Sequence, residues 1–406
     1  MKKILFLGNN THVDELIKFA KERGVYTIVT DNLPVEQSPF KAMADEAWDV
    51  SVLDYDVLEK KCKEEGINAI LCGASEVCIK ANKDLCERLG LPFYANQRAW
   101  DITNDKLAFK EACEACGLNV PAEYHLDKTL KAEDIAKIKY PVVVKPADGC
   151  SSIGLHICNN EEELKAGYLD AYEKSPEKKV VVEDFIAGEQ VGFIYAVIKG
   201  EPHLFISGDD CACKDNSERR VFGATPTKHM DLFDKELRNQ IDKLVEYLEI
   251  KDGIIGLQTI FDGSKFVALE MNYRLPGGKV PGEKYLCDVM LDNALNEDTK
   301  PTFTPQPGQV FSYALWLNPG KIADIQGVDV LQSQPQKYNV QLFRHVGDDV
   351  EENSGMRQIL GYVMFFTDLE HHLEYTEEIN NTVKVISDSG EDLLIHYRFE
   401  EGYAVL

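Results

Sequence analysis

The sequence contains no long hydrophobic run and has a deficit of positive charge. The longest apolar stretch near the N-terminus, Ile4 to Leu7, is far too short for the core of a signal peptide or for a membrane span. Lys and Arg number 44 against 69 Asp and Glu, which gives a net charge of −25. Binding to a nucleic-acid backbone requires clustered cations, so nucleic acid is not an expected partner. We expect a soluble, cytoplasmic protein that acts on small molecules, without nucleic-acid or membrane partners.

Cysteine is present, but its pattern does not indicate disulfides. The 11 cysteines are odd in number and scattered through core-like sequence, which is typical of reduced thiols in a cytosolic protein. Cys113 and Cys116 form a CxxC within a helical pattern, and no second pair follows, so a buried helix face is favoured over a zinc or redox site. Cys211 and Cys213 lie in a polar stretch, where reactivity is the less favoured alternative.

The first hundred residues predict a parallel, doubly wound sheet. With 406 residues the chain suggests two to four domains, and residues 2–95 alternate short apolar strands with amphipathic helices. Gly8 lacks the further glycines of a GxGxxG fingerprint, which argues against dinucleotide binding. The loops 8–11 and 73–76 follow strand ends and are candidates for binding a small polar substrate, with plain turn chemistry as the alternative. The expected strands are 3–8, 25–29 and 69–72, and the expected helices are 13–24, 53–66 and one that ends at Gly90.

Residues 104–154 contain lysines and small residues near the ends of an expected helix and an expected strand. A helix is expected over 104–116 with Lys106 in its first turn, where a bound anion would offset the unfavourable position of a cation. A strand that carries Lys145 then leads into a loop of small residues, which can approach phosphate closely. A hairpin turn is the alternative, and the loop is not a Walker motif because no GK[ST] follows. The residues of this loop that we consider phosphate ligands are Gly149, Ser151, Ser152 and Gly154.

Residues 180–188 form an apolar stretch that ends in acidic residues. Such a strand can present Glu183 and backbone groups to an adenine edge, with Glu189 or Gln190 reaching ribose hydroxyls; an exposed strand end is the alternative. Residues 208–227 read as a long polar loop, and a loop of that length is usually functional or disordered. Its basic residues are Lys214, Arg219 and Arg220.

Residues 254–272 predict a β-hairpin that brings oxygen ligands together. The dipeptide Asp262-Gly263 is a turn signal, and side-chain alternation puts Glu270 and Asn272 on one face, which Phe266 and Ala268 share. If the loop has three residues, Gln258 lies opposite Ala268 and diagonal to Glu270, whereas a strict two-residue turn would put Gln258 on the wrong face.

Such a ligand set suits magnesium, which takes one or two carboxylates in addition to substrate phosphates. Arg274 continues on the face of Glu270 and Asn272, where its guanidinium can hold a carboxylate or an acyl phosphate. A surface hairpin with solvated polar residues is the alternative.

The last hundred residues predict further strands around one helix. The expected strands are 309–317, 340–344, 361–366 and 393–399, and the expected helix is 368–383. His371 and His372 are adjacent on that helix and cannot share a face, so a metal role is not expected for them.

Taken in order, these features resemble the ATP-grasp superfamily. The likeness covers roughly residues 1–300, and the Arg-Leu-Pro-Gly-Gly ending after Tyr273 is most similar to the carbamoyl-phosphate-synthase-related and L-amino-acid ligase branch. The features that carry it are Lys106, Lys145, the 149–154 loop, the run Glu183 to Gly188, Gln258, and Glu270-x-Asn272-x-Arg274.

This resemblance implies an α/β and α+β multidomain fold. The N-terminal parallel-sheet domain, a Rossmann-like pre-ATP-grasp domain, would span 1–98, and a two-lobed ATP-grasp domain would span 99–300, with a nucleotide-covering lobe at about 120–183. Residues 301–406 would form a small α+β domain similar to the C-terminal domains of biotin carboxylases and amino-acid ligases.

The resemblance also implies ATP as the nucleotide and Mg²⁺ as the metal, with Mn²⁺ as an alternative. Arg274 and Lys145 would be the catalytic residues, Arg274 by stabilising an acyl phosphate and its tetrahedral adduct. The metal position before Glu270 is often a carboxylate in the family, and the neutral Gln258 could weaken binding of a second ion, so the number of ions stays open. The implied contacts are Lys106, Lys145 and the 149–154 loop on the phosphates, Glu183, Asp184, Phe185 and Ile186 on adenine, Glu189 or Gln190 on ribose, and Gln258, Glu270 and Asn272 on magnesium.

The expected function is that of an ATP-dependent carboxylate-amine ligase that forms an acyl phosphate and releases ADP and phosphate. The substrates would be an amino acid or another small carboxylate and an amine. The absence of a Ser-His-Asp or Cys-His arrangement is consistent with catalysis by positioning and electrostatics. The first alternative is activation of bicarbonate to carboxyphosphate, and the second is a nucleotide-binding regulatory or structural protein without catalysis. A homodimer is expected from the resemblance alone.

Overall fold

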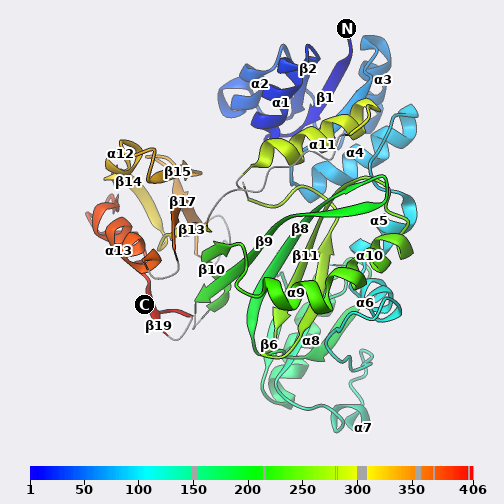
Figure 1. Cartoon of the computed structure of the whole chain (residues 1–406), viewed down its shortest axis with the longest axis vertical. Coiled ribbons are helices and arrows are strands. Elements are labelled where there is room, and N and C mark those ends of the chain that lie inside the picture. Colours follow the sequence, from blue (N-terminus) through cyan, green and yellow to red (C-terminus); the bar gives the residue numbers. More distant parts are fainter. Residues whose placement is uncertain are drawn as a thin grey trace.

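The computed structural model describes residues 1–148, 153–213, 216–278, 280, 282–299, 309–352, 358–368, 371–400 and 403–405. Within these ranges the chain forms a parallel four-stranded sheet, a ten-stranded sheet and two three-stranded sheets, with helices packed on them (Figure 1). This confirms the expected α/β and α+β multidomain class. No helix of the described ranges is long and apolar enough to cross a membrane.

The N-terminal sheet is parallel and has the strand order β3-β2-β1-β4. The expected strands and helices are present, because their apolar residues recur at strand and helix spacing. Strand β3 and the short helix α2 were not expected, since β3 has the sequence EAWD, in which only Trp48 is buried. The strands are β1 (Lys3–Leu7), β2 (Tyr26–Asp31), β3 (Glu46–Asp49) and β4 (Ala69–Cys72). The helical elements are α1 (Val13–Glu22), η1 (Val35–Gln37), α2 (Pro39–Met43), α3 (Tyr55–Glu65) and α4 (Glu76–Leu89).

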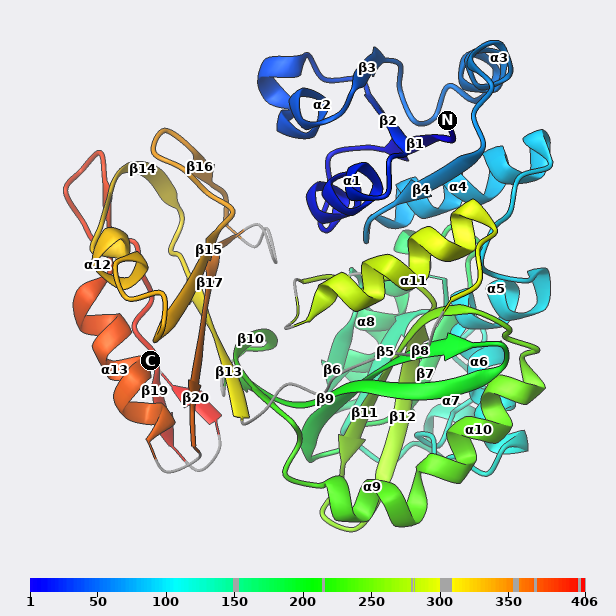
Figure 2. The same cartoon turned by 45° about the horizontal axis from the view of Figure 1, so that its top comes forward.

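Helix α11 (Glu283–Leu295) joins this sheet to the rest of the molecule (Figures 1 and 2). Its apolar residues share one core with side chains of α1, β1 and β11 (Gly253–Phe261). Arg23, which follows α1, forms ion pairs with Asp288 at 2.7 Å and Asp292 at 2.5 Å on α11. A segment that follows the hairpin in sequence therefore completes the core of the N-terminal sheet.

The ten-stranded sheet is the largest sheet of the described chain. The order of its main strands is β12-β11-β8-β9-β10-β13-β17-β15. Helices α5 (Gln97–Asn104), α6 (Lys106–Ala115), α9 (Met230–Glu236) and α10 (Arg238–Tyr247) contribute to one apolar core on a face of β8, β11 and β12. The strands are β8 (Glu189–Ile198), β9 (Glu201–Cys213), β10 (Asn216–Thr225), β11 (Gly253–Phe261), β12 (Phe266–Asn272), β13 (Gln309–Trp316), β15 (Tyr338–Leu342) and β17 (Ile359–Thr367).

The expectation of a long loop over 208–227 was wrong. Strands β9 and β10 occupy most of it and pair antiparallel, because Val221, Phe222 and Ala224 are buried in a core shared with β13 and β17. Lys214 and the side chains of Arg219 and Arg220 lie outside the described part of the chain.

A small sheet with the order β6-β5-β7 forms a separate lobe beside the large sheet. Helix α8 covers it, and its core includes Val142, Val144, Leu164 and Val182. The elements of this lobe are α7 (Ala132–Ile135), β5 (Val142–Pro146), β6 (His156–Cys158), α8 (Glu161–Lys174) and β7 (Val180–Asp184).

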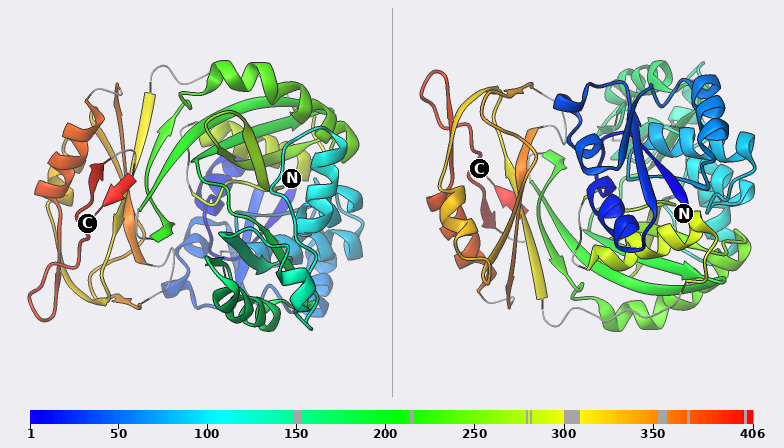
Figure 3. Two further views of the ribbon diagram at one scale, coloured as in Figure 1. Left: turned by 90° about the horizontal axis from the view of Figure 1, so that it is seen from below. Right: turned by 90° about the horizontal axis from the view of Figure 1, so that it is seen from above.

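The C-terminal part stands beside the rest and continues the large sheet through the pairing of β10 with β13 (Figure 3). Of the expected strand 393–399 only its end lies in a strand, because Leu394 makes an isolated bridge to Leu317 instead of a ladder. His371 contacts Asp368, and the His372 ring stacks on Phe311 at 5.2 Å. The elements are α12 (Val328–Gln332), α13 (His372–Thr382), β14 (Gly320–Gln326), β16 (Asp349–Val350), β18 (Lys384–Ser387), β19 (Arg398–Glu400) and β20 (Tyr403–Val405).

The described cysteines are buried, except for Cys211, which is half-buried. Cys113 and Cys116 are 0% and 5% exposed and face the core beneath α6, as the helical reading predicts. The described cysteines are all free thiols.

Candidate active site

The β11–β12 hairpin places Gln258 directly opposite Glu270. Phe261 pairs with Phe266, so the connecting loop has four residues, and Asp262 closes it by accepting from the amides of Ser264 and Lys265. A regular ladder from that loop would set Gln258 against Leu269. A bulge shifts the register by one residue between the Thr259–Ala268 pair and the next pair. Because of this shift, Gln258 lies opposite Glu270.

The bulge also changes which residues share a face. Phe266 and Ala268 lie in the core under the helices, together with Met271. The expectation that they share the face of Glu270 and Asn272 was therefore wrong, because the extra residue reverses the alternation after Ala268. Glu270 and Asn272 do share a face with Gln258, and all three side chains are half-buried.

Arg274 follows directly on this group. Its Nη2 donates to Asn272 Oδ1 at 3.1 Å, and its Nη1 donates to the Leu275 carbonyl at 3.0 Å. Its Nε donates at 2.5 Å to the carboxylate of Glu76, which begins α4. The structure thus brings the 73–76 loop of the N-terminal sheet next to the hairpin.

Tyr273 fixes the strand end between Asn272 and Arg274. Its single hydroxyl proton is shared between the carbonyls of Asp252 and Tyr94, and the Tyr94 hydroxyl donates to the Tyr273 carbonyl at 2.9 Å. Burial raises the pKa of both phenols, so both remain neutral donors. The reciprocal bonds hold the backbone from which the Arg274 side chain projects.

The two N-terminal loops form one surface. The Asn10 side chain donates to the Leu7 carbonyl at 3.0 Å and accepts from the Ser75 amide at 3.4 Å. A Cβ on Gly73 would lie 1.8 Å from the Thr11 carbonyl oxygen, so only glycine permits this approach. The loops 8–11 and 73–76 are therefore packed together at the carboxyl ends of β1 and β4.

Lys145, one of the two lysines expected at the phosphates, shares a buried carboxylate with Lys110, which was not expected there. Lys145 on β5 forms an ion pair with Glu183 Oε1 at 2.5 Å, and Lys110 on α6 forms a second pair with Glu183 Oε2 at 2.6 Å. Burial alone would raise the pKa of the Glu183 carboxyl, but Lys145 and Lys110 hold it below its usual value. The two ion pairs place the carboxylate between two ammonium groups, and its side chain is 3% exposed.

Lys106 begins α6, and its amide donates to the Ala147 carbonyl at 3.2 Å. Asp105 caps the helix through the amides of Leu107 and Ala108. Gly154 adopts a left-handed φ of 78° beside the Lys174 side chain. Three further residues of the small-residue loop, Gly149, Ser151 and Ser152, lie outside the described part of the chain.

The residues at the end of β7 make hydrogen bonds within the protein that the sequence did not predict. Asp184 accepts from the Tyr124 hydroxyl at 2.7 Å, and the Phe185 amide donates to the Pro141 carbonyl at 3.2 Å. The Phe185 side chain is 37% exposed, so its ring offers a surface for a flat ligand, and Ile186 follows it directly.

Glu189 and Gln190 point to opposite faces of the large sheet. Glu189 contacts Lys228 at 2.7 Å and His229 at 2.9 Å. Burial alone would raise the pKa of Glu189, but these two partners lower it. Gln190 pairs with Ile260, two residues from the pair of Gly192 with Gln258, and therefore lies on the face of Gln258.

Lys110 is a functional candidate that was not predicted from the sequence. Lys110 lies four residues after Lys106 and therefore on the same face of α6, which was the available signal. Its side chain is 7% exposed.

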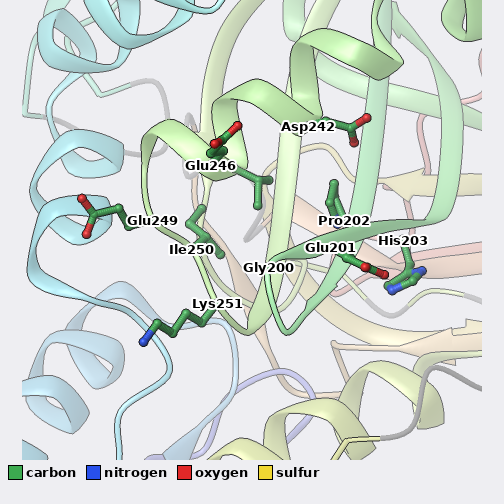
Figure 4. A pocket seen from close by; sticks show the side chains of 10 residues that line it. Gly200, Glu201, Pro202, His203, Asp242, Glu246, Glu249, Ile250 and Lys251 are labelled. Atoms are coloured by element: carbon green, nitrogen blue, oxygen red, sulfur yellow. The ribbon is translucent and has the colours of Figure 1, made fainter.

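A surface cavity of about 670 Å³ lies elsewhere, at the turn between β8 and β9 (Figure 4). It is lined by Glu201, Asp242, Glu246 and Glu249 among others. The turn is seven residues along β8 from Gly192, roughly 20 Å at 3.3 Å per residue, so this cavity is separate from the hairpin group.

The hairpin group has the donor chemistry of a sparse hard-cation site. Glu270 supplies one carboxylate, and Gln258 and Asn272 supply two amide oxygens, which leaves coordination to be completed by substrate oxygens or water. In the described ranges no cluster of three His, Cys, Asp or Glu residues could hold a metal by itself.

Comparison with known proteins identifies the domain. Residues 103–278 match the family model of the ATP-grasp domain. In sequence the chain is 25% identical to the formate-dependent phosphoribosylglycinamide formyltransferase of Prochlorococcus marinus over 67% of this chain and 70% of that protein. It is 26% identical to the N-terminal section of the carbamoyl phosphate synthase large chain of Aquifex aeolicus, over 75% of this chain but only 61% of that protein.

Solved structures share the fold over nearly the whole chain. The L-amino acid ligase from Bacillus licheniformis has a TM-score of 0.79 at 17% identity and covers 96% of this chain and 99% of its own. The biotin carboxylase domain dimer of the 2-oxoglutarate carboxylase from Hydrogenobacter thermophilus has a TM-score of 0.75 at 18% identity over 97% and 91%. That structure was solved with MgADP, ADP and bicarbonate.

Proposed function

We propose that this chain, an ATP-grasp enzyme, joins a small carboxylate to an amine and converts ATP to ADP and phosphate. The observation that carries the proposal is the hairpin group. Gln258, Glu270 and Asn272 share one face, and Arg274 is bonded to Asn272 and to Glu76 of the N-terminal loop. The proposed metal-nucleotide site and a guanidinium suited to an anion thus adjoin a surface suited to a small polar substrate.

The donor set fits a magnesium ion, with manganese as the alternative. Gln258, Glu270 and Asn272 would hold it with the ATP phosphates, where its charge stabilises a developing phosphoryl charge. With one carboxylate in the set, we propose that one ion is bound more tightly than a second.

Lys145 and Lys106 are proposed to hold the phosphates, with the 149–154 loop over them. Adenine is proposed to lie against Phe185 and the backbone of Ile186, with Glu183 and Asp184 beside it. Glu189 is bound by Lys228 and His229 on the other face of the sheet, and this supports Gln190 as the ribose contact.

The chemistry then needs no protein nucleophile. A carboxylate oxygen of the first substrate attacks the γ-phosphorus, and ADP leaves with the electron pair of the broken P–O bond. The amine attacks the acyl carbon of the acyl phosphate, phosphate leaves, and the amine loses a proton. Arg274 would hold the acyl phosphate oxygens through its planar guanidinium, and its fixed position reduces the reorganisation that the reaction requires.

The test uses Glu270→Ala and Arg274→Ala, with phosphate release measured over a panel of paired carboxylates and amines. Both variants should lose turnover by about 100-fold or more, the order seen when a charge-stabilising group is removed. Glu201→Ala, in the separate cavity, is the matched control and should retain activity. Near-normal phosphate release by both folded site variants would overturn the assignment.

The likeness to a carbamoyl phosphate synthase large chain and to a biotin carboxylase domain favours bicarbonate as a second candidate substrate. In that case ADP formation should depend on bicarbonate and proceed without any amino acid. Phosphate release that requires both an organic acid and an amine would exclude it.

We also propose a cytoplasmic homodimer, since one protein of the same fold was solved as a dimer. Light scattering coupled to size-exclusion chromatography measures this directly, and a mass of about 45.7 kDa in solution would exclude the dimer.

A further inference from the structure

Lys110 lies on helix α6, which packs on the large sheet, but its side chain contacts the small lobe. Its neighbours on α6, Phe109, Ala112 and Cys113, are buried in the core under the large sheet. Lys110 itself reaches the small lobe, where its ammonium lies 2.6 Å from Glu183 on β7. With 7% of its side chain exposed, it has little access to water.

Other contacts show that α6 is a junction between these layers. The Lys106 amide donates to the Ala147 carbonyl next to β5, and the Lys179 ammonium lies 3.6 Å from Asp105, the cap of α6. Glu123, in the segment bridged to Glu183, lies 3.9 Å from the Lys110 ammonium. These contacts between α6 and the small lobe therefore fix the position of the buried Lys110 side chain.

The arrangement gives Glu183 two cations, one on each oxygen. Lys145 is the more accessible, at 12% exposure, and it lies on the strand that leads into the small-residue loop. If Lys145 alone neutralised Glu183, its move to a nucleotide phosphate would leave a buried carboxylate without a counter-charge, which is strongly unfavourable. With Lys110 in place, Glu183 stays neutralised whether or not Lys145 turns away.

We propose that Lys110 is a positioning residue for ATP binding: it neutralises Glu183 so that the Lys145 ammonium is released to the ATP phosphates. This inference rests on the proposed function, in which Lys145 contacts those phosphates. Lys110 itself touches no substrate. It acts by weakening the competition of Glu183 for Lys145.

The test measures MgATP affinity by isothermal titration calorimetry on the full chain. Lys110→Met should weaken binding by about tenfold or more, the order for losing a contact to a charged group. Lys110→Arg should bind within about threefold of the wild type, because it restores the ion pair. Lys137→Met, at a lysine of the small lobe that is 72% exposed, is the matched control and should bind normally.

A double variant separates positioning from a purely structural role. In Lys110→Met/Glu183→Gln the competing carboxylate is gone, so affinity should return to that of Glu183→Gln alone. Affinity that stays as low as in Lys110→Met, or Lys110→Met binding like the wild type, would overturn the inference. Absence of MgATP binding by the wild type would instead overturn the proposed function, so the two failures are distinguishable.

Discussion

Replacing Glu183 with Gln should loosen the small lobe from the helical layer. The carboxylate accepts a hydrogen bond from Lys145 at 2.5 Å and forms an ion pair with Lys110 at 2.6 Å. The side chains of Glu183, Lys145 and Lys110 are 3%, 12% and 7% exposed. Removing one partner of a buried ion pair costs about 3–5 kcal/mol, because a charge remains buried. Here Lys110 keeps Glu123 at 3.9 Å and Lys145 retains some access to water, so we expect about 3 kcal/mol.

Amide hydrogen exchange is the suitable assay, since a multidomain chain does not unfold in a single two-state step. A loss of about 3 kcal/mol corresponds to a roughly 150-fold loss of protection in β5 and β7. The N-terminal sheet should be unaffected, and Glu201→Gln serves as the control. A change of less than about threefold in β5 and β7 would refute the reasoning. So would a Lys110→Met/Glu183→Gln variant that is less protected than Glu183→Gln, since removing the stranded lysine should restore protection.

Three further changes test the surroundings of the site. Tyr273→Phe removes the hydroxyl that bonds the Asp252 and Tyr94 carbonyls and should lower local stability by about 1–2 kcal/mol, measured as a loss of amide-exchange protection at the end of β12. Gly73→Ala forces a Cβ to within 1.8 Å of the Thr11 carbonyl and should destabilise the N-terminal sheet by more than about 2 kcal/mol, whereas Gly277→Ala, which meets no atom within 4 Å, should not. Burial opposes the two lysines, but together the lysines lower the pKa of Glu183, so its contribution to stability is present above the unfolded pKa of about 4.3 and is lost as the pH falls further. The protection factors of the β7 amides, taken relative to the intrinsic exchange rate at each pH, should therefore fall in acid for the wild type but not for Glu183→Gln.

The local pattern of the sequence was sufficient for the elements that bury one continuous face. Strand β1 and helix α1 follow from their apolar spacing alone. The same reasoning failed for 208–227, where the residues are polar in sequence. Burial of Phe222 against β13 and β17 comes from strands about ninety residues or more away, and local sequence carries no record of that pairing.

The hairpin shows a different limit. Alternation predicted that Glu270 and Asn272 share a face, and this holds because both lie after the bulge. It also predicted that Ala268 joins them, which fails because the bulge lies between. A bulge adds one residue to one strand without a distinctive residue at that point, so the register followed from the tertiary pairing and not from the sequence.

Lys110 could be recognised only in part. Its spacing from Lys106 places both on one face of α6, but its partner Glu183 is on a strand of another sheet. Sequence can indicate that two cations share a helix face; it cannot indicate which carboxylate neutralises one of them.

Arg274 is held at a fixed position by contacts within the protein alone. Its guanidinium bonds Asn272 on one side and Glu76 on the other, while Tyr273 between them is tied to Tyr94. These contacts join the end of β12 to the start of α4, so the guanidinium position depends on the docking of the N-terminal sheet and not on the hairpin alone. Because α11 completes the core of that sheet, its packing and the placement of Arg274 are parts of one structural unit. In the mechanism proposed above, this prior order favours Arg274 as the acyl-phosphate ligand, since a guanidinium that had to be ordered during the reaction would contribute less to the rate.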